Sequence, residues 1–172
     1  QRDDTAVWRS LIAGDDSIYG TQWGDTEKGA SGHDVIVGGA GNDLLFGNRG
    51  NDVLNGGADH DSLIGGPGRD ALEGGTGHNS LTGGAGRDTF HYNDRVGRGY
   101  FHSQYNDVIA DFAPDQDVIV FNSSTRGGSF DTLVLRSPYG VSGGRDGVVI
   151  ELRGTNFSKT VELVGVEWSD LT

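Results

Sequence analysis

The sequence contains no cysteine and no methionine, and its formal charge of −12 leaves it short of basic residues. Without cysteine the chain can form neither disulfides nor thiolate metal sites. No stretch approaches the ~20 consecutive apolar residues that a membrane-spanning helix requires, so we expect no membrane span. Nucleic-acid phosphates would repel so acidic a chain, which argues against nucleic acid as a partner.

The abundant feature is a nine-residue repeat that runs from Gly29 to His91, seven times without a gap. Each unit follows the pattern Gly-Gly-x-Gly-x-Asp-x-(large apolar)-x. The sixth position holds Asp34, Asp43, Asp52, Asp61, Asp70, Asn79 and Asp88. The eighth position holds Ile36, Leu45, Leu54, Leu63, Leu72, Leu81 and Phe90. A fixed period of this kind predicts a stack of similar structural units.

The same phase extends toward the N-terminus. Residues 11–19 supply Gly14, Asp16 and Ile18 at the expected positions. Residues 20–28 keep Asp25 but place Glu27 where a large apolar residue belongs. We interpret residues 20–28 as a degenerate coil or a bulge.

Each unit combines a glycine-rich turn with a short apolar segment. Glycine lets the backbone adopt positive φ and turn tightly, so that several carbonyl oxygens point into the turn. The three residues that follow, as in Val35–Val37, suit a brief strand whose middle side chain points inward. If two units make one coil, the inward side chains form two columns, Ile18, Ile36, Leu54, Leu72 and Phe90 in one and Leu45, Leu63 and Leu81 in the other.

Such a coil has a thin core. Each unit buries only about one large side chain, too little to offset backbone ordering at roughly 1–2 kcal/mol per residue. The turns, however, offer carbonyl and carboxylate oxygens, the ligands that Ca²⁺ prefers. The absence of cysteine, and of histidines stacked at ligand spacing, disfavours transition metals. The sequence therefore predicts that calcium supplies much of the folding free energy and that the repeats are disordered without it.

The charge distribution agrees with bound cations. The chain has 14 acidic and 6 basic residues up to His91, and 11 and 7 after it. About four to six calcium ions would add roughly +8 to +12 charges and nearly cancel the deficit. A purely solvating acidic surface is the alternative, but it would not place an aspartate at every ninth residue.

The repeat resembles the repeats-in-toxin family, whose nonapeptides form a right-handed parallel β-roll with Ca²⁺ held between the turns of each edge. The resemblance implies that sixth-position side chains bridge neighbouring ions. One edge would carry Asp16, Asp34, Asp52, Asp70 and Asp88, and the other Asp25, Asp43, Asp61 and Asn79.

The resemblance also implies main-chain carbonyl ligands from the first four positions of the turns. At the first position these are Gly38, Gly56, Gly65, Gly74 and Gly83, and at the second Gly39, Asn48, Gly57, Gly66 and Gly75. At the third position they are Ala40, Ala58, Pro67, Thr76 and Ala85, and at the fourth Gly32, Gly41, Gly50, Asp59, Gly68 and Gly77. Asn48 and Asp59 replace glycine, and both residue types tolerate left-handed backbone. Asn79 lacks a shareable carboxylate, so the ion between Asp61 and Asn79 should be the weakest or missing.

Beyond Tyr92 the period is lost. Apolar runs at residues 107–112, 117–121, 130–135, 147–152 and 160–166 predict strands separated by glycine and serine turns. We therefore divide the chain into an N-terminal cap (1–10), an all-β roll (11–91) and a β-rich C-terminal cap (92–172) that closes the last apolar layer. The stretch that begins at Asp107 is similar to the segment after the roll in secreted metalloproteases and in the repeat modules of alginate C5-epimerases. That resemblance makes Asp107 a candidate ligand; the alternative is that Asp107, Asp111 and Asp117 cap strand ends.

No spacing in the sequence supplies a nucleophile, base and orienting group, so we predict a non-catalytic module. His33, His60 and His78 occupy the fifth position of their units, where we expect solvated side chains rather than ligands.

Two functions follow from these observations. The first is a calcium-binding module of a larger secreted bacterial protein, which the resemblance implies is exported by type I secretion, folds outside the cell and stabilises an attached passenger domain. The absence of cysteine fits such a protein, although cysteine-free cytosolic proteins are also common. The alternative is a module that binds an anionic polysaccharide such as alginate through arginines and aromatic residues of the second half, among them Arg95, Arg98, Arg126, Arg136, Arg145 and Arg153.

Overall fold

The computed structural model describes residues 9–10, 13–94, 105–123, 132–136, 147–154, 157–164 and 166. Every regular element among them is a β-strand, and the described residues contain no helix able to cross a membrane. The strands of the repeats are β1 Arg9–Ser10, β2 Ser17–Tyr19, β3 Thr26–Lys28, β4 Val35–Ala40, β5 Leu44–Phe46, β6 Val53–Ala58, β7 Ser62–Gly68, β8 Ala71–Gly75, β9 Ser80–Gly86 and β10 Thr89–Asp94. They are followed by β11 Tyr105–Ile109, β12 Val118–Ser123, β13 Thr132–Arg136, β14 Gly147–Gly154 and β15 Phe157–Val164.

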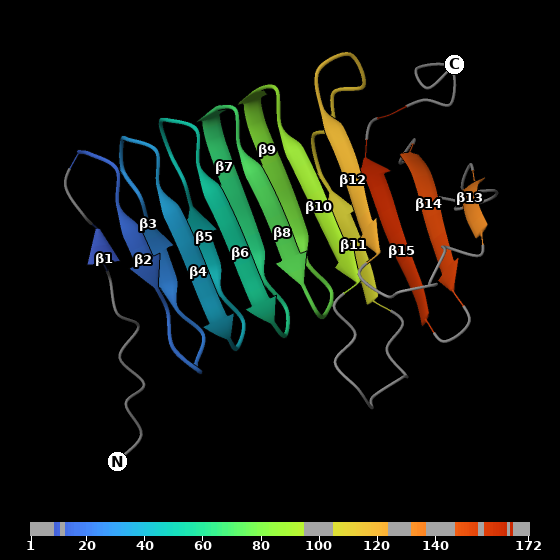
Figure 1. Ribbon diagram of the computed structural model, residues 1–172, viewed down its shortest axis with the longest axis horizontal. Helices are drawn as coiled ribbons and strands as arrows, with labels where there is room; N and C mark the ends of the chain where they lie inside the picture. The colour runs from blue at the N-terminus through green and yellow to red at the C-terminus, as the bar shows by residue number, and fades with distance from the viewer. Residues whose placement is uncertain are drawn as a thin grey trace.

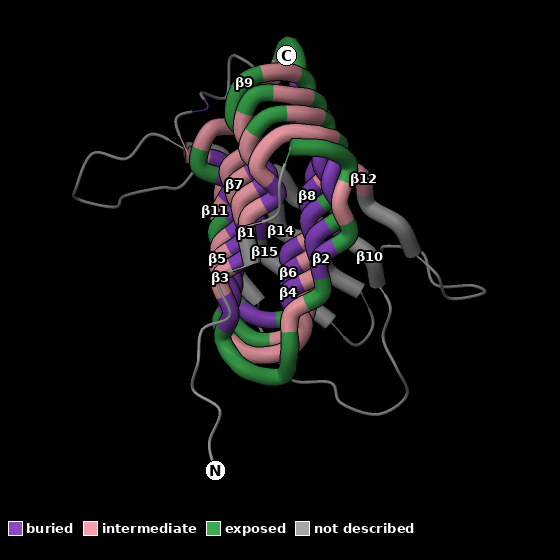
Figure 2. The backbone as a smooth tube through the Cα atoms, turned by 90° about the vertical axis from the view of Figure 1, so that its left-hand side faces the viewer, coloured by how far each residue is buried: buried purple, intermediate pink, exposed green. Residues whose placement is uncertain are grey.

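The strands alternate between two sheets that face each other across a thin interior (Figures 1 and 2). One sheet has the order β1-β3-β5-β7-β9-β11-β15-β14-β13, and the other has the order β12-β10-β8-β6-β4-β2. Within the repeats all pairs are parallel and join residues eighteen apart, as in Ile36↔Leu54 and Leu45↔Leu63. Two nonapeptides therefore make one coil, and the predicted parallel β-roll is confirmed.

The inward columns also lie as the period predicts. Ile36 is fully buried, whereas Val35 beside it is 37 % exposed, because successive side chains of a strand point to opposite faces. The two columns run without interruption through the repeats and merge with Tyr92, Ile109, Val161, Leu163 and Val166 in one core cluster. The core is therefore long but only one side chain thick on each wall.

Residues 20–28 form a regular nonapeptide unit, half of one coil, rather than a bulge. Strand β3 pairs in parallel with β5 through Glu27↔Leu45 and with β1 through Arg9↔Glu27. Glu27 occupies the inward column and is only 1 % exposed. Backbone pairing on both sides keeps this strand in register in spite of a carboxylate at a core position.

The turns depend on left-handed backbone at defined positions. Gly50 has a φ of 136°, and a Cβ there would collide with the carbonyl oxygen of Gly32 in the preceding coil. Asn48 and Asp59, which stand in place of glycine, have φ values of 75° and 80°. Both therefore adopt the left-handed conformation that their residue types were expected to tolerate.

The second half continues both walls of the roll. Strand β11 pairs in parallel with β9 and β15, and β12 pairs in parallel with β10. Strands β14 and β13 then add to the sheet in antiparallel orientation. Phe112 packs on Phe90 with ring centroids 6.1 Å apart and helps to close the last apolar layer. The strands expected in this half are present within a few residues of their predicted bounds, whereas most of the proposed 1–10 cap lies outside the described residues.

Candidate metal centre

The sixth-position side chains form one ladder on each edge of the roll. In each ladder the Oδ1 atom of an aspartate accepts a hydrogen bond from the backbone amide of the sixth-position residue one coil earlier. The amide of Asp34 donates to Asp52 at 2.8 Å, and the amide of Asp52 donates to Asp70 at 2.8 Å. The same bond recurs on the opposite edge and at both ends of this one. One carboxylate oxygen of each aspartate is thus committed to the protein.

In most of these aspartates the other carboxylate oxygen has no hydrogen-bond partner among the described residues. The Oδ2 atoms of seven aspartates are buried without a hydrogen bond, namely those of Asp16, Asp34, Asp43, Asp52, Asp61, Asp70 and Asp88. Burying a carboxylate oxygen without a partner is costly, and native proteins rarely do it. Desolvation by burial, opposed in part by the amide bond, raises the pKa of Asp43 to about 6 and that of Asp61 and Asp70 to about 7. The regular repetition of this cost along both edges indicates that the edges are built to bind cations.

From Asp34 onward, the unpaired oxygens point into turns that have no room for a side chain. A Cβ on Gly65 would collide with the Oδ2 of Asp70 and with the carbonyl oxygen of Gly83. A Cβ on Gly68 would likewise collide with the carbonyl oxygen of Gly50. The space between stacked turns is therefore bounded by carboxylate and carbonyl oxygens.

The donor set selects the type of ion. Among the described residues no three His, Asp or Glu side chains converge on one point, so an ion must draw most of its ligands from the backbone. A cage of carbonyl oxygens with one or two carboxylates fits the hard cation Ca²⁺ and does not fit zinc or copper. The predicted carbonyl ligands belong to the turns that form this cage, and their assignment atom by atom stays a prediction.

Asn79 departs from the pattern. Its Oδ1 accepts the amide of Asp61 at 2.9 Å, while its Nδ2 donates to the Oδ1 of Asp107 at 3.2 Å. The Nδ2 atom lies over Gly74, where the other turns have the unpaired Oδ2. An NH₂ group cannot ligate a cation, so this turn lacks the acidic oxygen of its neighbours.

Both ladders continue beyond the repeats. Asp107 accepts the amide of Asn79 at 3.1 Å, and Asp117 accepts the amide of Asp88 at 2.9 Å. The sequence reasoning selected Asp107 as a candidate but missed the place of Asp117 in the other ladder. The signal was present, because Asp117-Val118-Ile119 repeats positions six to eight, but the longer connection hides the phase.

Residues 28–63 and 64–94 match the family model of the RTX calcium-binding nonapeptide repeat. These segments are RTX calcium-binding repeats. Among solved structures, the chain is similar to the AlgE6R3 subunit of the mannuronan C5-epimerase from Azotobacter vinelandii, with 24 % identity over 95 % of this chain and 79 % of that one and a TM-score of 0.31. It is also similar to the extracellular lipase LipA from Serratia marcescens, with 17 % identity over 92 % of this chain and 37 % of that one and a TM-score of 0.36. A search of the curated proteins found no match.

Two aspartates at the ladder ends pair their Oδ2 atoms with the protein itself. The Oδ2 of Asp25 accepts the amide of Thr21 at 2.6 Å and its hydroxyl at 2.8 Å. The Oδ2 of Asp117 accepts the amide of Ala113 at 2.8 Å. Asp25 begins the described part of one ladder and Asp117 ends the other. At these two ladder ends, N–H or O–H groups of a local turn bond the Oδ2 atom and take the place that a cation would have in the other turns.

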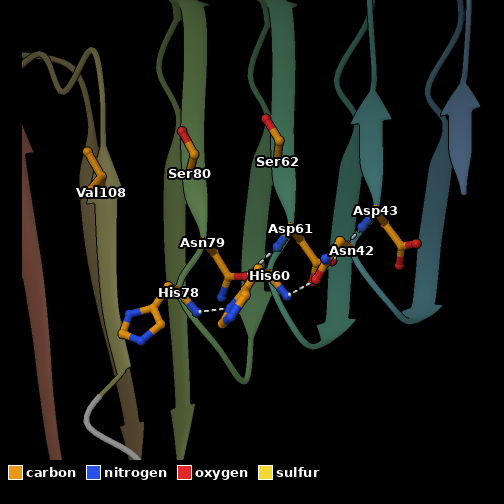
Figure 3. A pocket seen from close by; sticks show the side chains of 9 residues that line it. All are labelled: Asn42, Asp43, His60, Asp61, Ser62, His78, Asn79, Ser80 and Val108. Atoms are coloured by element: carbon orange, nitrogen blue, oxygen red, sulfur yellow. Dashed lines mark hydrogen bonds between the residues drawn. The ribbon is translucent and has the colours of Figure 1, made fainter. Parts of the chain in front are cut away.

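The histidines of the RTX turns do more than contact solvent. His33 accepts the amide of Asn51 through Nδ1 at 2.8 Å, and His60 accepts the amide of His78 at 3.0 Å. His60 and His78 also lie side by side in the pocket of Figure 3, with ring centroids 5.2 Å apart. The two rings are neighbours because residues eighteen apart are adjacent on this coil, and among the described residues they belong to no group of three possible metal ligands. A His60 that accepts at Nδ1 carries its proton on Nε2, which leaves no lone pair for a transition metal.

Proposed function

We propose that the chain is a calcium-dependent folding module of a larger secreted bacterial protein. In this proposal the module is unfolded in the calcium-poor cytosol, passes through a type I secretion channel, and folds outside the cell. The observation that supports it best is the set of seven buried, unpaired Oδ2 atoms, six of which lie within the segments that match calcium-binding repeats.

The energetics of the roll support calcium dependence. Without ions, each edge holds a column of buried carboxylates, one in each successive coil. Their desolvation and mutual repulsion cost free energy that the thin core cannot offset. Extracellular calcium modules bind with dissociation constants of about 10⁻⁴–10⁻³ M. An ion that binds only the folded state at about 100 times its dissociation constant stabilises that state by ~2.7 kcal/mol, so about four to six ions would suffice to fold the roll.

The folded module would act on a covalently attached passenger domain. A solenoid that folds only after export offers a stable, closed surface against which a neighbouring domain can dock and complete its own folding. In the proposed organisation residues 11–91 form the calcium roll, residues 1–10 cap one end, and residues 92–172 cap the other. The module itself would be non-catalytic.

A calcium titration of the metal-free chain, followed by far-ultraviolet circular dichroism, tests this function. We expect a cooperative coil-to-strand transition in the millimolar range with calcium and no transition with magnesium, which demands a smaller and more regular octahedral site. A chain with the same strand content in chelator as in calcium would contradict the proposal.

The alternative from the sequence, an anionic-polysaccharide module, has less support. Its arginines lie outside the described residues, except Arg136 and Arg153, which are on β13 and β14. Calorimetric titration of the calcium-loaded chain with alginate oligomers tests it directly. Heat that saturates at millimolar or lower ligand would establish this second function, and its absence would remove it.

A further inference from the structure

A second hydrogen-bond ladder runs outside the aspartate ladders, along the fifth position of the turns. On one edge the amide of His33 donates to Asp15 at 2.7 Å, the amide of Asn51 to His33 at 2.8 Å, and the amide of Arg69 to Asn51 at 2.8 Å. All acceptors are side-chain atoms, and all donors lie one coil later.

The opposite edge repeats the arrangement with other residues. The amide of His60 donates to Asn42 at 3.0 Å, and the amide of His78 donates to His60 at 3.0 Å (Figure 3). Asp, Asn and His differ in shape and charge, yet each presents an acceptor at a similar distance from the backbone. The shared property of the fifth position is therefore acceptance of one particular amide.

The direction of that amide fixes the direction of the carbonyl in the same peptide unit. The N–H of a fifth-position residue and the C=O of the fourth-position residue are parts of the same planar, trans peptide, so they point in opposite directions. When the N–H of Asn51 points back toward His33, the carbonyl of Gly50 must point forward toward the next coil. The structure agrees, because a Cβ on Gly68 in that coil would collide with the Gly50 carbonyl oxygen.

The oriented carbonyls have no other partner in the described part of the chain. The oxygens of Gly32, Gly50 and Asp59 accept no hydrogen bond from the described residues. Each oxygen points toward the fourth-position glycine of the next coil, namely Gly50, Gly68 and Gly77. We infer that the fifth-position side chains are positioning residues for calcium: each holds one peptide plane so that its fourth-position carbonyl faces the ion before the ion binds. This inference rests on the calcium-dependent function proposed above.

The ladder also has a natural interruption. Arg69 and Arg87 occupy the fifth position further along the first edge, and a guanidinium has no acceptor. The bond between fifth positions therefore ends at the amide of Arg69, and the peptide between Gly86 and Arg87 is not held in this way. Arg87 provides a matched control, since it is an exposed fifth-position residue whose truncation removes no acceptor.

The test compares His60→Ala, His60→Asn and Arg87→Ala in the full chain. We expect His60→Ala to raise the calcium concentration at the folding midpoint by about two- to tenfold, the range for one lost hydrogen bond. The variant should also speed hydrogen exchange of the His78 amide. Asparagine should restore both, as Asn42 performs this role one coil earlier. Arg87→Ala should match the wild type. Terbium bound in place of calcium adds a spectroscopic readout, because a lost carbonyl ligand admits water and shortens the luminescence lifetime.

The outcomes separate the two proposals. If the wild type shows no calcium-induced folding, the proposed function fails. If the wild type folds with calcium but His60→Ala and His33→Ala both leave the midpoint and the terbium lifetime unchanged, or asparagine does not restore them, the positioning role is wrong. His33→Ala and His33→Asn repeat the test on the other edge through the Gly50 carbonyl. Should both alanine variants fail to fold, folding of both asparagine variants would still support the inference, and their failure would overturn it.

Discussion

Replacing Asp70 by asparagine separates the two carboxylate oxygens of a ladder aspartate. The amide of Asp52 donates to the Oδ1 of Asp70 at 2.8 Å, and an asparagine oxygen can accept that bond equally well. Only the unpaired Oδ2 changes, and it becomes an NH₂ group like that of Asn79. The variant therefore keeps the ladder and removes the oxygen assigned to calcium.

The expected effect has opposite signs with and without calcium. In calcium, a bridging carboxylate serves two ions, each worth ~2.7 kcal/mol at about 100 times its dissociation constant, so the loss reaches up to ~5 kcal/mol. In chelator, burial raises the pKa of Asp70 from 3.8 to about 7. Keeping the carboxylate ionised at about pH 8 then costs about 4 kcal/mol, which a neutral amide avoids. Asp70→Asn should thus destabilise the calcium-loaded roll and stabilise the metal-free one.

Two titrations followed by circular dichroism measure this inversion. Urea unfolding in about 10 mM calcium gives the stability of the loaded roll. If the metal-free chain is unfolded, the concentration of trimethylamine oxide that folds it in chelator reports the stability of the metal-free roll. Asp115→Asn, at an exposed position, is the matched control and should change neither. Equal destabilisation of Asp70→Asn in calcium and in chelator would refute the assignment of Oδ2 to the ion.

Three further predictions follow from the same geometry. Asn79→Asp should strengthen calcium binding and lower the midpoint of the folding transition, because it restores an acidic oxygen to its turn; an unchanged midpoint would contradict this. Gly65→Ala should lower the calcium stoichiometry measured by equilibrium dialysis, since its Cβ would displace the Oδ2 of Asp70. Burial raises the pKa of Asp43 to about 6 and of Asp61 and Asp70 to about 7, so between about pH 4 and 7 the folded metal-free roll binds more protons than the unfolded chain. Its stability in chelator should therefore fall as the pH rises through that window. The calcium concentration at the folding midpoint should be higher at pH 5.5 than at pH 8, because calcium must displace those protons. A pH-independent midpoint would count against the raised pKa values.

The repeat alone was sufficient to predict the coil and its two aspartate edges. A period of nine residues with glycine, aspartate and leucine at constant positions permits few arrangements. Because every coil is built from the same local turns and strands, local preferences add up to the global fold. Asn79 was identified as the weak member for the same reason, since a break in a strict pattern is visible without coordinates.

Other features depend on which atoms meet across coils. The phase placed Glu27 at an inward position but left open whether residues 20–28 form a coil or a bulge, because pairing with both neighbouring strands decides that. Asp117 joins a ladder only because the chain returns to the roll after a connection of irregular length. His33 and His60 are exposed, as expected, but each also accepts a backbone amide, since residues eighteen apart become neighbours only in the stacked coil. The sequence by itself determined the local turn, the strand and their period. Only the stacking of coils decided which carboxylate oxygen is paired, which is left for an ion, and which side chains orient the carbonyls around it. These features depend on contacts between residues that are distant along the chain.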